Sequence, residues 1–207
     1  MVLRHDGEHV SEVDGEAIRY PWTTCPGAVE PLRALMGMPL ARSATAARSH
    51  TDVRMNCTHL FDLAGLAVAH AAAGREVRQY DATVPDRRHG RTRAVLHRDG
   101  EPCLEWELDR QTITAPEPFA GVALRGSFLA WVQETFADED MAEAAGVLRR
   151  ACEISFGRGV DLDAVGRASE LGEMVVGSCH SFQPGTIDQA VRVKGTTLDF
   201  SVASPEL

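Results

Sequence analysis

The seven residues from Asn56 to Asp62 contain the densest group of chemically reactive side chains in the sequence. Within this stretch Cys57 supplies a thiol, His59 an imidazole and Asp62 a carboxylate. Groups of these three types carry out nucleophilic and general acid–base chemistry in enzymes. A run of small apolar residues begins directly after His59, so the reactive groups are predicted to lie where a buried helix starts.

His59 and Asp62 are three residues apart, which places them on the same face of a helix, one turn from each other. The positive end of the helix dipole favours a neutral imidazole, the form that acts as a base. Asp62 would orient the ring or act as a second acid or base. The alternative is an ordinary helix start, in which Thr58 caps the helix, Asp62 complements the dipole and His59 is a hydrogen-bonded structural residue.

The cysteines allow a nucleophilic interpretation as well as a structural one. Cys25 and Cys57 each precede a predicted helix start, where a thiol becomes more reactive. The alternative is that both are small buried hydrophobic residues, the more common state of a free cysteine. Five cysteines without paired spacing favour reduced thiols over a disulfide framework.

Metal binding is a further interpretation, because several side chains are of types that zinc prefers: Cys25, Cys57, His59, Cys179 and His180. The spacing defines no site, since neither a Cys-x-x-Cys nor a His-x-x-x-His pair is present. Eleven residues of helix would separate His70 from His59 by about 16 Å. No phosphate loop or nucleotide fingerprint is found. We therefore predict no bound metal and no cofactor.

Aromatic and basic residues predict a pocket for a flat or acyl compound over the start of this helix. Tyr80 is predicted to donate a hydrogen bond to developing negative charge, and Arg150 to hold a substrate carboxylate. The alternatives are a tyrosine at a sheet edge and an arginine that faces solvent or the helix C-terminus. The predicted substrate-binding residues are Trp22, Cys25, Asn56, Cys57, Trp106 and Arg150.

The order of the strands and helices that the sequence predicts indicates an α+β fold. It would have an antiparallel sheet of about four to five strands packed against helices and a helical C-terminal half. Strands are expected over residues 16–20, 53–57, 76–84, 91–98, 102–113 and 198–202. Helices are expected over residues 26–36, 60–73, 127–136, 140–156 and 164–176, and an exposed connection over 41–50.

Three local patterns support this assignment. The pair Asp99-Gly100 between strand-like runs is a strong hairpin signal. Leu104, Trp106 and Leu108 alternate with acidic residues, which predicts a sheet with one packed and one wet face. The spacing of Asp140 and Glu143 fits a capping box at a helix start.

Length and composition indicate one globular domain over residues 1–207, because 44% of the residues are hydrophobic and 25% are charged. The sequence has no secretory signal and no run of about 18 apolar residues, so we expect a cytoplasmic protein without a membrane partner. A net charge of -9 argues against nucleic acid as a partner. A small-molecule substrate is the expected partner, and a homo-oligomer is left open.

Several motifs resemble a bacterial family catalogued only as a domain of unknown function, twenty-eight eighty-nine. They are Trp22-Thr23-Thr24-Cys25-Pro26-Gly27-Ala28, Asn56-Cys57-Thr58-His59-Leu60, Leu148-Arg149-Arg150 and Gly177-Ser178-Cys179. The resemblance spans about residues 17 to 193, and its most specific part is the Cys-Thr-His-Leu core with the upstream Cys-Pro. Asn56 stands where the family more usually has glycine, and the N-terminal region is shorter. The resemblance implies special positions and an association with small-molecule catabolism, but no activity.

The leading hypothesis is a lyase or isomerase that performs cofactor-independent acid–base chemistry on a small aromatic or acyl compound in bacterial catabolism. His59 would be the base, Asp62 its partner and Tyr80 the hydrogen-bond donor. One rival is a hot-dog-like hydratase or thioesterase, which leaves the helical residues after Ser127 unexplained. The other rival is a non-catalytic protein that binds a small ligand.

Overall fold

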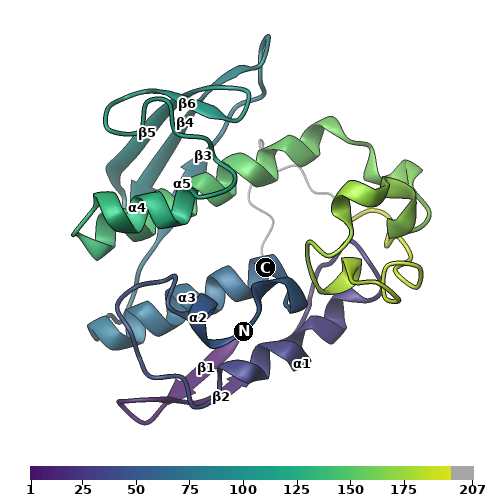
Figure 1. The fold of residues 1–207 in the computed structure, drawn as a ribbon, viewed down its shortest axis with the longest axis horizontal. Coiled ribbons are helices and arrows are strands. Elements are labelled where there is room, and N and C mark those ends of the chain that lie inside the picture. The colour runs from purple at the N-terminus through teal and green to yellow at the C-terminus, as the bar shows by residue number, and fades with distance from the viewer. Residues whose placement is uncertain (197–207) are drawn as a thin grey trace. The chain divides into compact units, whose positions relative to one another are not determined.

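A computed structural model describes residues 1–196 of the chain. The contacts among these residues divide into two compact units, with residues 1–40, 46–68 and 161–196 in unit 1 and residues 41–45 and 69–160 in unit 2. The fold class is α+β, as predicted. A four-stranded antiparallel sheet belongs to unit 2 and a two-stranded sheet to unit 1 (Figure 1).

The sheet of unit 2 is a simple meander in which each strand pairs with the next one along the chain. Its strands are β3 (Tyr80–Thr83), β4 (Arg91–Arg98), β5 (Glu101–Asp109) and β6 (Thr112–Ala115). Asp99 and Gly100 join β4 to β5 with φ angles of 55° and 86°, so the predicted hairpin is confirmed. The expected single strand over 102–113 is instead two strands, because the chain reverses at Arg110, whose φ is 53°.

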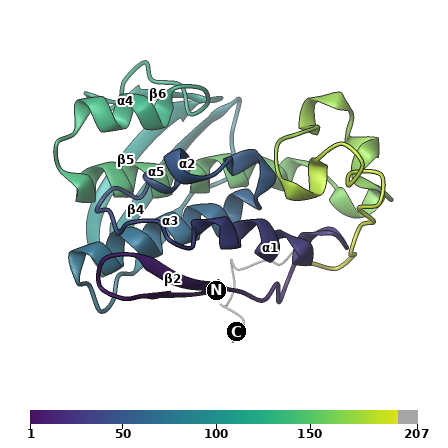
Figure 2. The same ribbon diagram turned by 60° about the horizontal axis from the view of Figure 1, so that its bottom comes forward.

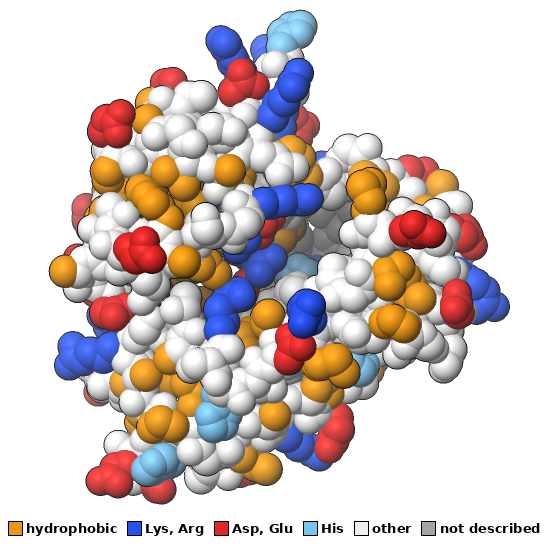
Figure 3. All heavy atoms as spheres, in the orientation of Figure 1, with side chains coloured by type: hydrophobic (Ala, Val, Ile, Leu, Met, Phe, Trp, Pro, Cys, Tyr) orange, Lys and Arg blue, Asp and Glu red, His pale blue; other side chains and the backbone are white. Residues whose placement is uncertain are grey.

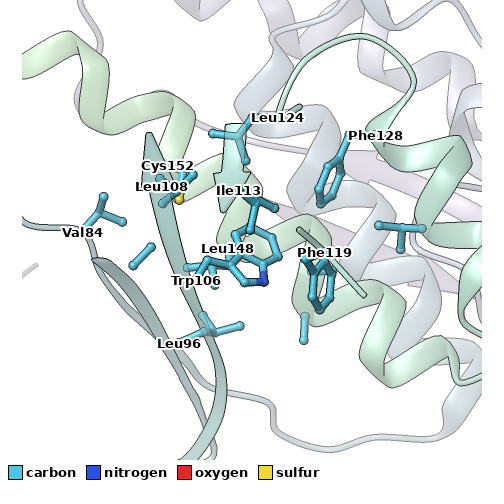
Figure 4. Close-up of a cluster of buried hydrophobic side chains, with 14 of the residues drawn as sticks. Val84, Leu96, Trp106, Leu108, Ile113, Phe119, Leu124, Phe128, Leu148 and Cys152 are labelled. Carbon is cyan, nitrogen blue, oxygen red and sulfur yellow. The ribbon is translucent and has the colours of Figure 1, made fainter. Parts of the chain in front are cut away.

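Two helices complete unit 2, namely α4 (Phe128–Thr135) and α5 (Glu139–Ser155). Helix α5 packs on the sheet and α4 packs against α5 (Figure 1). Trp106 and Leu108 of β5 are buried, whereas Glu105 and Glu107, which alternate with them along the strand, are exposed. This confirms the predicted alternation. Figure 4 shows the Trp106 side chain among the other buried hydrophobic side chains of this core.

The predicted capping box at Asp140 and Glu143 is wrong. Helix α5 begins at Glu139, and its cap is Asp138, whose carboxylate accepts a hydrogen bond from the Asp140 backbone N–H at 3.0 Å. The carboxylates of Asp140 and Glu143 therefore do not cap the helix, and they contact other elements of unit 2.

Unit 1 begins with a hairpin that the sequence analysis missed, formed by β1 (Val2–His5) and β2 (Val10–Asp14). The strand expected over 16–20 is absent from the structure. Two short helices follow, α1 (Val29–Leu32) and α2 (Ala47–His50), and 3₁₀ turns over Cys25–Ala28 and Arg33–Leu35 flank α1. The hairpin and these helices are seen in Figure 2.

Helix α3 (Thr58–Ala73) confirms the predicted apolar helix and ends before Gly74, which has a φ of 63°. Residues 58–68 belong to unit 1 and residues 69–73 to unit 2. In unit 1, Phe61, Ala64 and Val68 of α3 are buried in a core with residues of the hairpin and of the segment around α1. The first turn of α3 is therefore held in unit 1 by its own apolar face.

Three further expectations fail or fall outside the described part of the chain. The segment over 53–57 is not extended but forms a 3₁₀ turn, Val53–Met55, because Asp52 caps it by accepting a hydrogen bond from the Arg54 backbone N–H. The helix over 164–176 is replaced by short 3₁₀ turns, which Gly172 interrupts with a φ of 87°. The strand over 198–202 lies outside the described residues.

None of the helices found in residues 1–196 is both long enough and apolar enough to cross a membrane. The face shown in Figure 3 carries acidic, basic and hydrophobic side chains next to one another. This mixture agrees with the negative but moderate net charge of the chain.

Candidate thiol and imidazole site

Three motif segments that are distant in the sequence meet in unit 1. The His180 backbone N–H donates a hydrogen bond to the Asn56 carbonyl at 3.0 Å, and the Ser181 hydroxyl donates to Cys25 Sγ at 3.3 Å. A Cβ atom added to Gly27 would lie only 3.1 Å from His180 Nε2, so this glycine permits close packing. The segments around residues 25, 57 and 179 therefore form one site. We call Cys25, Cys57 and Cys179, together with His59, the thiol cluster.

Trp22 anchors the first of these segments. Its side chain is 4% exposed and packs with Ala168, Ile187 and Ala190, and its ring meets Phe182 edge-on at a centroid distance of 6.1 Å. The Cys25 backbone N–H donates to the Trp22 carbonyl at 2.9 Å, which opens the 3₁₀ turn that contains Cys25. The predicted binding residue Trp22 thus holds the cluster in place from within the core.

Cys57 and His59 form a close pair at the start of α3. The Cys57 carbonyl accepts a hydrogen bond from the Phe61 backbone N–H at 2.9 Å, so Cys57 is the residue that precedes the first helical turn. Its Sγ atom lies 3.9 Å from His59 Nδ1. Cys57 is half-buried and His59 is exposed. In the tautomer that carries its proton on Nε2, His59 can accept the thiol proton at Nδ1.

The other two thiols of the cluster, Cys25 and Cys179, favour their protonated form. Burial is the main cause that raises the pKa of Cys25 and of Cys179 above the usual value for a thiol. The negative charge of a neighbouring Cys57 thiolate raises the pKa of both thiols further. Among the three thiols, Cys57 is therefore the one that combines a basic partner with partial access to solvent.

Asn56 is fully buried next to this pair. Its Nδ2 donates a hydrogen bond to the Asp52 carbonyl at 2.9 Å, but its Oδ1 has no hydrogen-bond partner among the described residues. A buried acceptor of this kind costs about 1–3 kcal/mol unless a donor reaches it. Asn56 thus holds the segment that carries Cys57 from within the core.

Asp62 is engaged by a neighbouring arginine. Its Oδ1 atom lies 3.6 Å from Arg48 Nη2, and both side chains are partly exposed. Arg48 therefore contacts the carboxylate that was predicted to orient His59, and Cys57 Sγ lies 3.9 Å from His59 Nδ1.

Tyr80, the third predicted catalytic residue, belongs to unit 2 and lies in a buried network there. Its hydroxyl donates to Glu143 Oε1 at 2.5 Å, and His70 Nε2 lies 2.9 Å from the same oxygen. The Glu143 side chain is only 3% exposed. Burial, followed by the Glu143 carboxylate, raises the pKa of Tyr80 well above its ordinary value. We call Glu143, Tyr80 and His70 the carboxylate network.

Ion pairs border this network. Arg75 pairs with Asp140, and its Nη1 lies 3.9 Å from Glu143 Oε1. The Arg75 guanidinium holds the pKa of Asp140 below its usual range. A pocket of ≈ 20 Å³ lies here, lined by Arg42, Ala69, Ala73, Arg75, Glu139, Asp140 and Glu143. That volume holds about one water molecule, so the pocket is too small to bind a substrate.

The two remaining predicted binding residues also belong to unit 2. Trp106 is completely buried in the hydrophobic core, with its ring 5.1 Å from Phe119 and 5.8 Å from Phe128. Arg150 pairs with Glu153 at 3.2 Å one turn along α5. The structure therefore brings together Trp22, Cys25, Asn56, Cys57, His59 and Asp62 in unit 1, and places Tyr80, Trp106 and Arg150 in unit 2.

The donor set that zinc prefers does not form a recognisable centre. Within residues 1–196 there is no group of three or more His, Cys, Asp or Glu side chains arranged to hold a metal ion. The chemistry of the cluster is therefore that of its thiols and its imidazole.

Sequence reasoning missed the roles of His70, Glu143 and Ser181. His70 was considered only as a co-ligand of His59, and Glu143 only as part of a cap. A usable signal for Glu143 was its place among Ala142, Ala144 and Ala145, since a carboxylate in a buried stretch of helix needs polar partners. Nothing in the sequence pairs Ser181 with Cys25, because only the tertiary fold joins their segments.

The site and fold define an α+β protein with a thiol–imidazole pair at a helix start. No family model, no curated protein and no solved structure matches this chain. The resemblance to family twenty-eight eighty-nine therefore stays a prediction.

Proposed function

We propose that this chain is an enzyme that acts on a small acyl compound through the Cys57–His59 pair. The observation that carries the proposal is the 3.9 Å approach of Cys57 Sγ to His59 Nδ1 at the start of α3. This assignment keeps His59 as the base and gives the nucleophilic role to the neighbouring thiol.

The proposed reaction follows the usual course of thiol catalysis. His59 accepts the Cys57 proton while the sulfur attacks the substrate carbonyl carbon, and the carbonyl electrons move to its oxygen. First-turn N–H groups of a helix have no partner within the helix, so those of α3 would stabilise this oxyanion. The leaving group then departs with a proton from the imidazolium, and water activated by His59 hydrolyses the acyl-thiol bond.

The exposure of the pair supports substrate binding next to it. His59 is exposed and Cys57 is half-buried, so a ligand can reach the reacting atoms from solvent. Asn56 is fully buried beside them and holds the segment through its hydrogen bond to the Asp52 carbonyl.

The lyase or isomerase mechanism predicted from the sequence has weaker support. It needs Asp62 to serve His59, yet Asp62 also faces Arg48 at 3.6 Å. It also needs the Tyr80 hydroxyl as a donor to substrate, and that hydroxyl donates to Glu143 at 2.5 Å in unit 2. Thiol chemistry requires neither residue.

An activated acyl ester tests the proposal. The purified chain is mixed with p-nitrophenyl acetate, and the burst of p-nitrophenolate and the acetylated peptide are measured. We expect acetylation at Cys57, no burst for Cys57→Ser, and a burst about 100-fold slower for His59→Gln. Cys103→Ser, which removes a half-buried thiol of unit 2, is the matched control and should behave like the parent chain. Equal acetylation of Cys57 and Cys103 would contradict the proposal.

A further inference from the structure

We propose that Cys57 and Cys179 form a site of reversible oxidation, at which a hydroperoxide converts Cys57 to a sulfenic acid and Cys179 closes it to a disulfide. This inference uses the same Cys57–His59 pair as the proposed function, but it does not depend on any acyl substrate. It assigns a role to a cysteine that the proposed reaction leaves unused.

The backbone brings the two cysteines into neighbouring positions. The hydrogen bond from the His180 N–H to the Asn56 carbonyl joins the residue after Cys179 to the residue before Cys57 at 3.0 Å. A disulfide requires Cα atoms about 4.4–6.8 Å apart, and Cys57 and Cys179 each directly adjoin one partner of this hydrogen bond. Cys57 and Cys179 thus lie next to the hydrogen bond that ties their segments together.

A second contact fixes the same two segments. The Gln183 side-chain amide donates to the Arg54 carbonyl at 2.7 Å and to the Cys179 carbonyl at 3.3 Å. The Phe182 N–H also donates to the Cys179 carbonyl at 3.0 Å, in the 3₁₀ turn that follows Cys179. The segment that carries Cys179 is therefore bonded to the segment that carries Cys57 through both a backbone and a side-chain donor.

The first chemical step oxidises Cys57. His59 accepts the thiol proton, and the sulfur attacks one oxygen of the hydroperoxide. The O–O bond breaks, and the leaving oxygen takes the proton from the imidazolium, so hydrogen peroxide yields water. The Cys57 sulfur loses two electrons and becomes a sulfenic acid, while the peroxide is reduced.

The second step forms the disulfide. The Cys179 sulfur attacks the Cys57 sulfur, the S–S bond forms, and the S–O bond breaks. The hydroxyl group leaves with the Cys179 proton as a second water molecule. A dithiol reductant reverses the reaction by thiol–disulfide exchange.

The surroundings of the two thiols fit this division of roles. Cys57 has an imidazole at 3.9 Å and is positioned to attack first. Cys179 is half-buried, and burial raises its pKa, so it stays a thiol until the sulfenic acid forms beside it. Cys25 is held instead by the Ser181 hydroxyl at 3.3 Å, which leaves Cys179 as the thiol in the segment bonded to Asn56.

The test exposes the folded full-length chain to hydrogen peroxide, blocks the remaining thiols and maps the peptides by mass spectrometry. We expect a Cys57–Cys179 crosslink with loss of two hydrogen atoms, which dithiothreitol removes. Cys179→Ser should stop at a Cys57 sulfenic acid that dimedone traps. Cys25→Ser and Cys103→Ser should both retain the crosslink.

Two results would overturn the inference: a folded parent chain in which Cys57 forms no disulfide, or a crosslink between Cys57 and Cys25. Circular dichroism of each variant shows whether it is folded. Failure of the acyl burst with an intact crosslink would reject only the proposed function. A normal burst without the crosslink would reject only the oxidation site.

Discussion

The thiol cluster of unit 1 and the carboxylate network of unit 2 are built in opposite ways. The cluster comes from turns and from the first residues of α3, and its central contact is a long 3.9 Å approach beside an exposed imidazole. The network comes from the last turn of α3, the start of β3 and helix α5, and it surrounds a carboxylate that is 3% exposed with contacts of 2.5 and 2.9 Å.

This difference indicates which group of residues reacts and which one holds the fold. A buried carboxylate needs hydrogen-bond partners, and Tyr80 and His70 both contact Glu143 Oε1. A thiol tolerates partial burial without strong partners, so Cys57 can remain available for chemistry. Tight mutual pairing in unit 2 thus points to stability, and loose pairing in unit 1 to reactivity.

The largest expected effect comes from removing the centre of the network. Glu143→Ala leaves Tyr80 and His70 without their buried acceptor and should lower the free energy of unfolding by about 3 kcal/mol, as measured by urea denaturation. Glu105→Ala, on the exposed face of β5, is the matched control and should cost less than about 0.5 kcal/mol. Equal losses in the two variants would contradict the stabilising role of the carboxylate network.

A smaller effect is expected from the tyrosine. Tyr80→Phe removes only the hydroxyl that donates to Glu143, which should cost about 1–2 kcal/mol of unfolding free energy. The rate at which p-nitrophenyl acetate acetylates Cys57 should not change. If that rate falls while the variant stays folded, Tyr80 takes part in the chemistry as the sequence first suggested.

The ion pair beside the network predicts a dependence on pH. Because Arg75 lowers the pKa of Asp140 in the folded chain, the ionised carboxylate stabilises the fold above its unfolded pKa of about 3.9. That stabilisation is lost as the pH falls through the lower folded pKa. Asp140→Asn should therefore lose less stability than the parent chain between pH 7 and about pH 3, by under about 1 kcal/mol given its partial exposure. Identical acid profiles of the two chains would contradict this.

The smallest effect on stability is expected in the thiol cluster itself. His59 is exposed, and the contact with Cys57 is long, so His59→Gln should change the free energy of unfolding by less than about 0.5 kcal/mol. A loss of folding in this variant would instead support the interpretation of His59 as a structural residue of the helix start.

Local patterns in the sequence predicted much of the fold. The apolar run of α3, the Asp99-Gly100 turn and the alternation around Trp106 each depend on neighbouring residues, and all three were confirmed. The failures occurred where short turns replace regular elements. Asp52 caps a 3₁₀ turn where a strand was expected, and Gly172 interrupts the expected helix over 164–176.

The candidate site was predicted only in part, for a related reason. The proximity of Cys57 and His59 follows from their spacing in the sequence. The hydrogen bonds of His180 with Asn56 and of Ser181 with Cys25 link residues more than a hundred positions apart, and no periodicity encodes such contacts. Tyr80 was predicted to donate a hydrogen bond to a substrate, whereas its hydroxyl donates to Glu143, a partner that becomes visible only when α5 packs on the sheet.

The most direct test of the central claim is the rate at which iodoacetamide alkylates each cysteine at pH 7.5, followed by peptide mass spectrometry. If Cys57 and His59 form a reactive pair, Cys57 should react at least about tenfold faster than Cys103, and His59→Gln should remove that advantage while the chain stays folded. Equal rates for Cys57 and Cys103, unchanged by His59→Gln, would contradict the assignment of chemistry to unit 1.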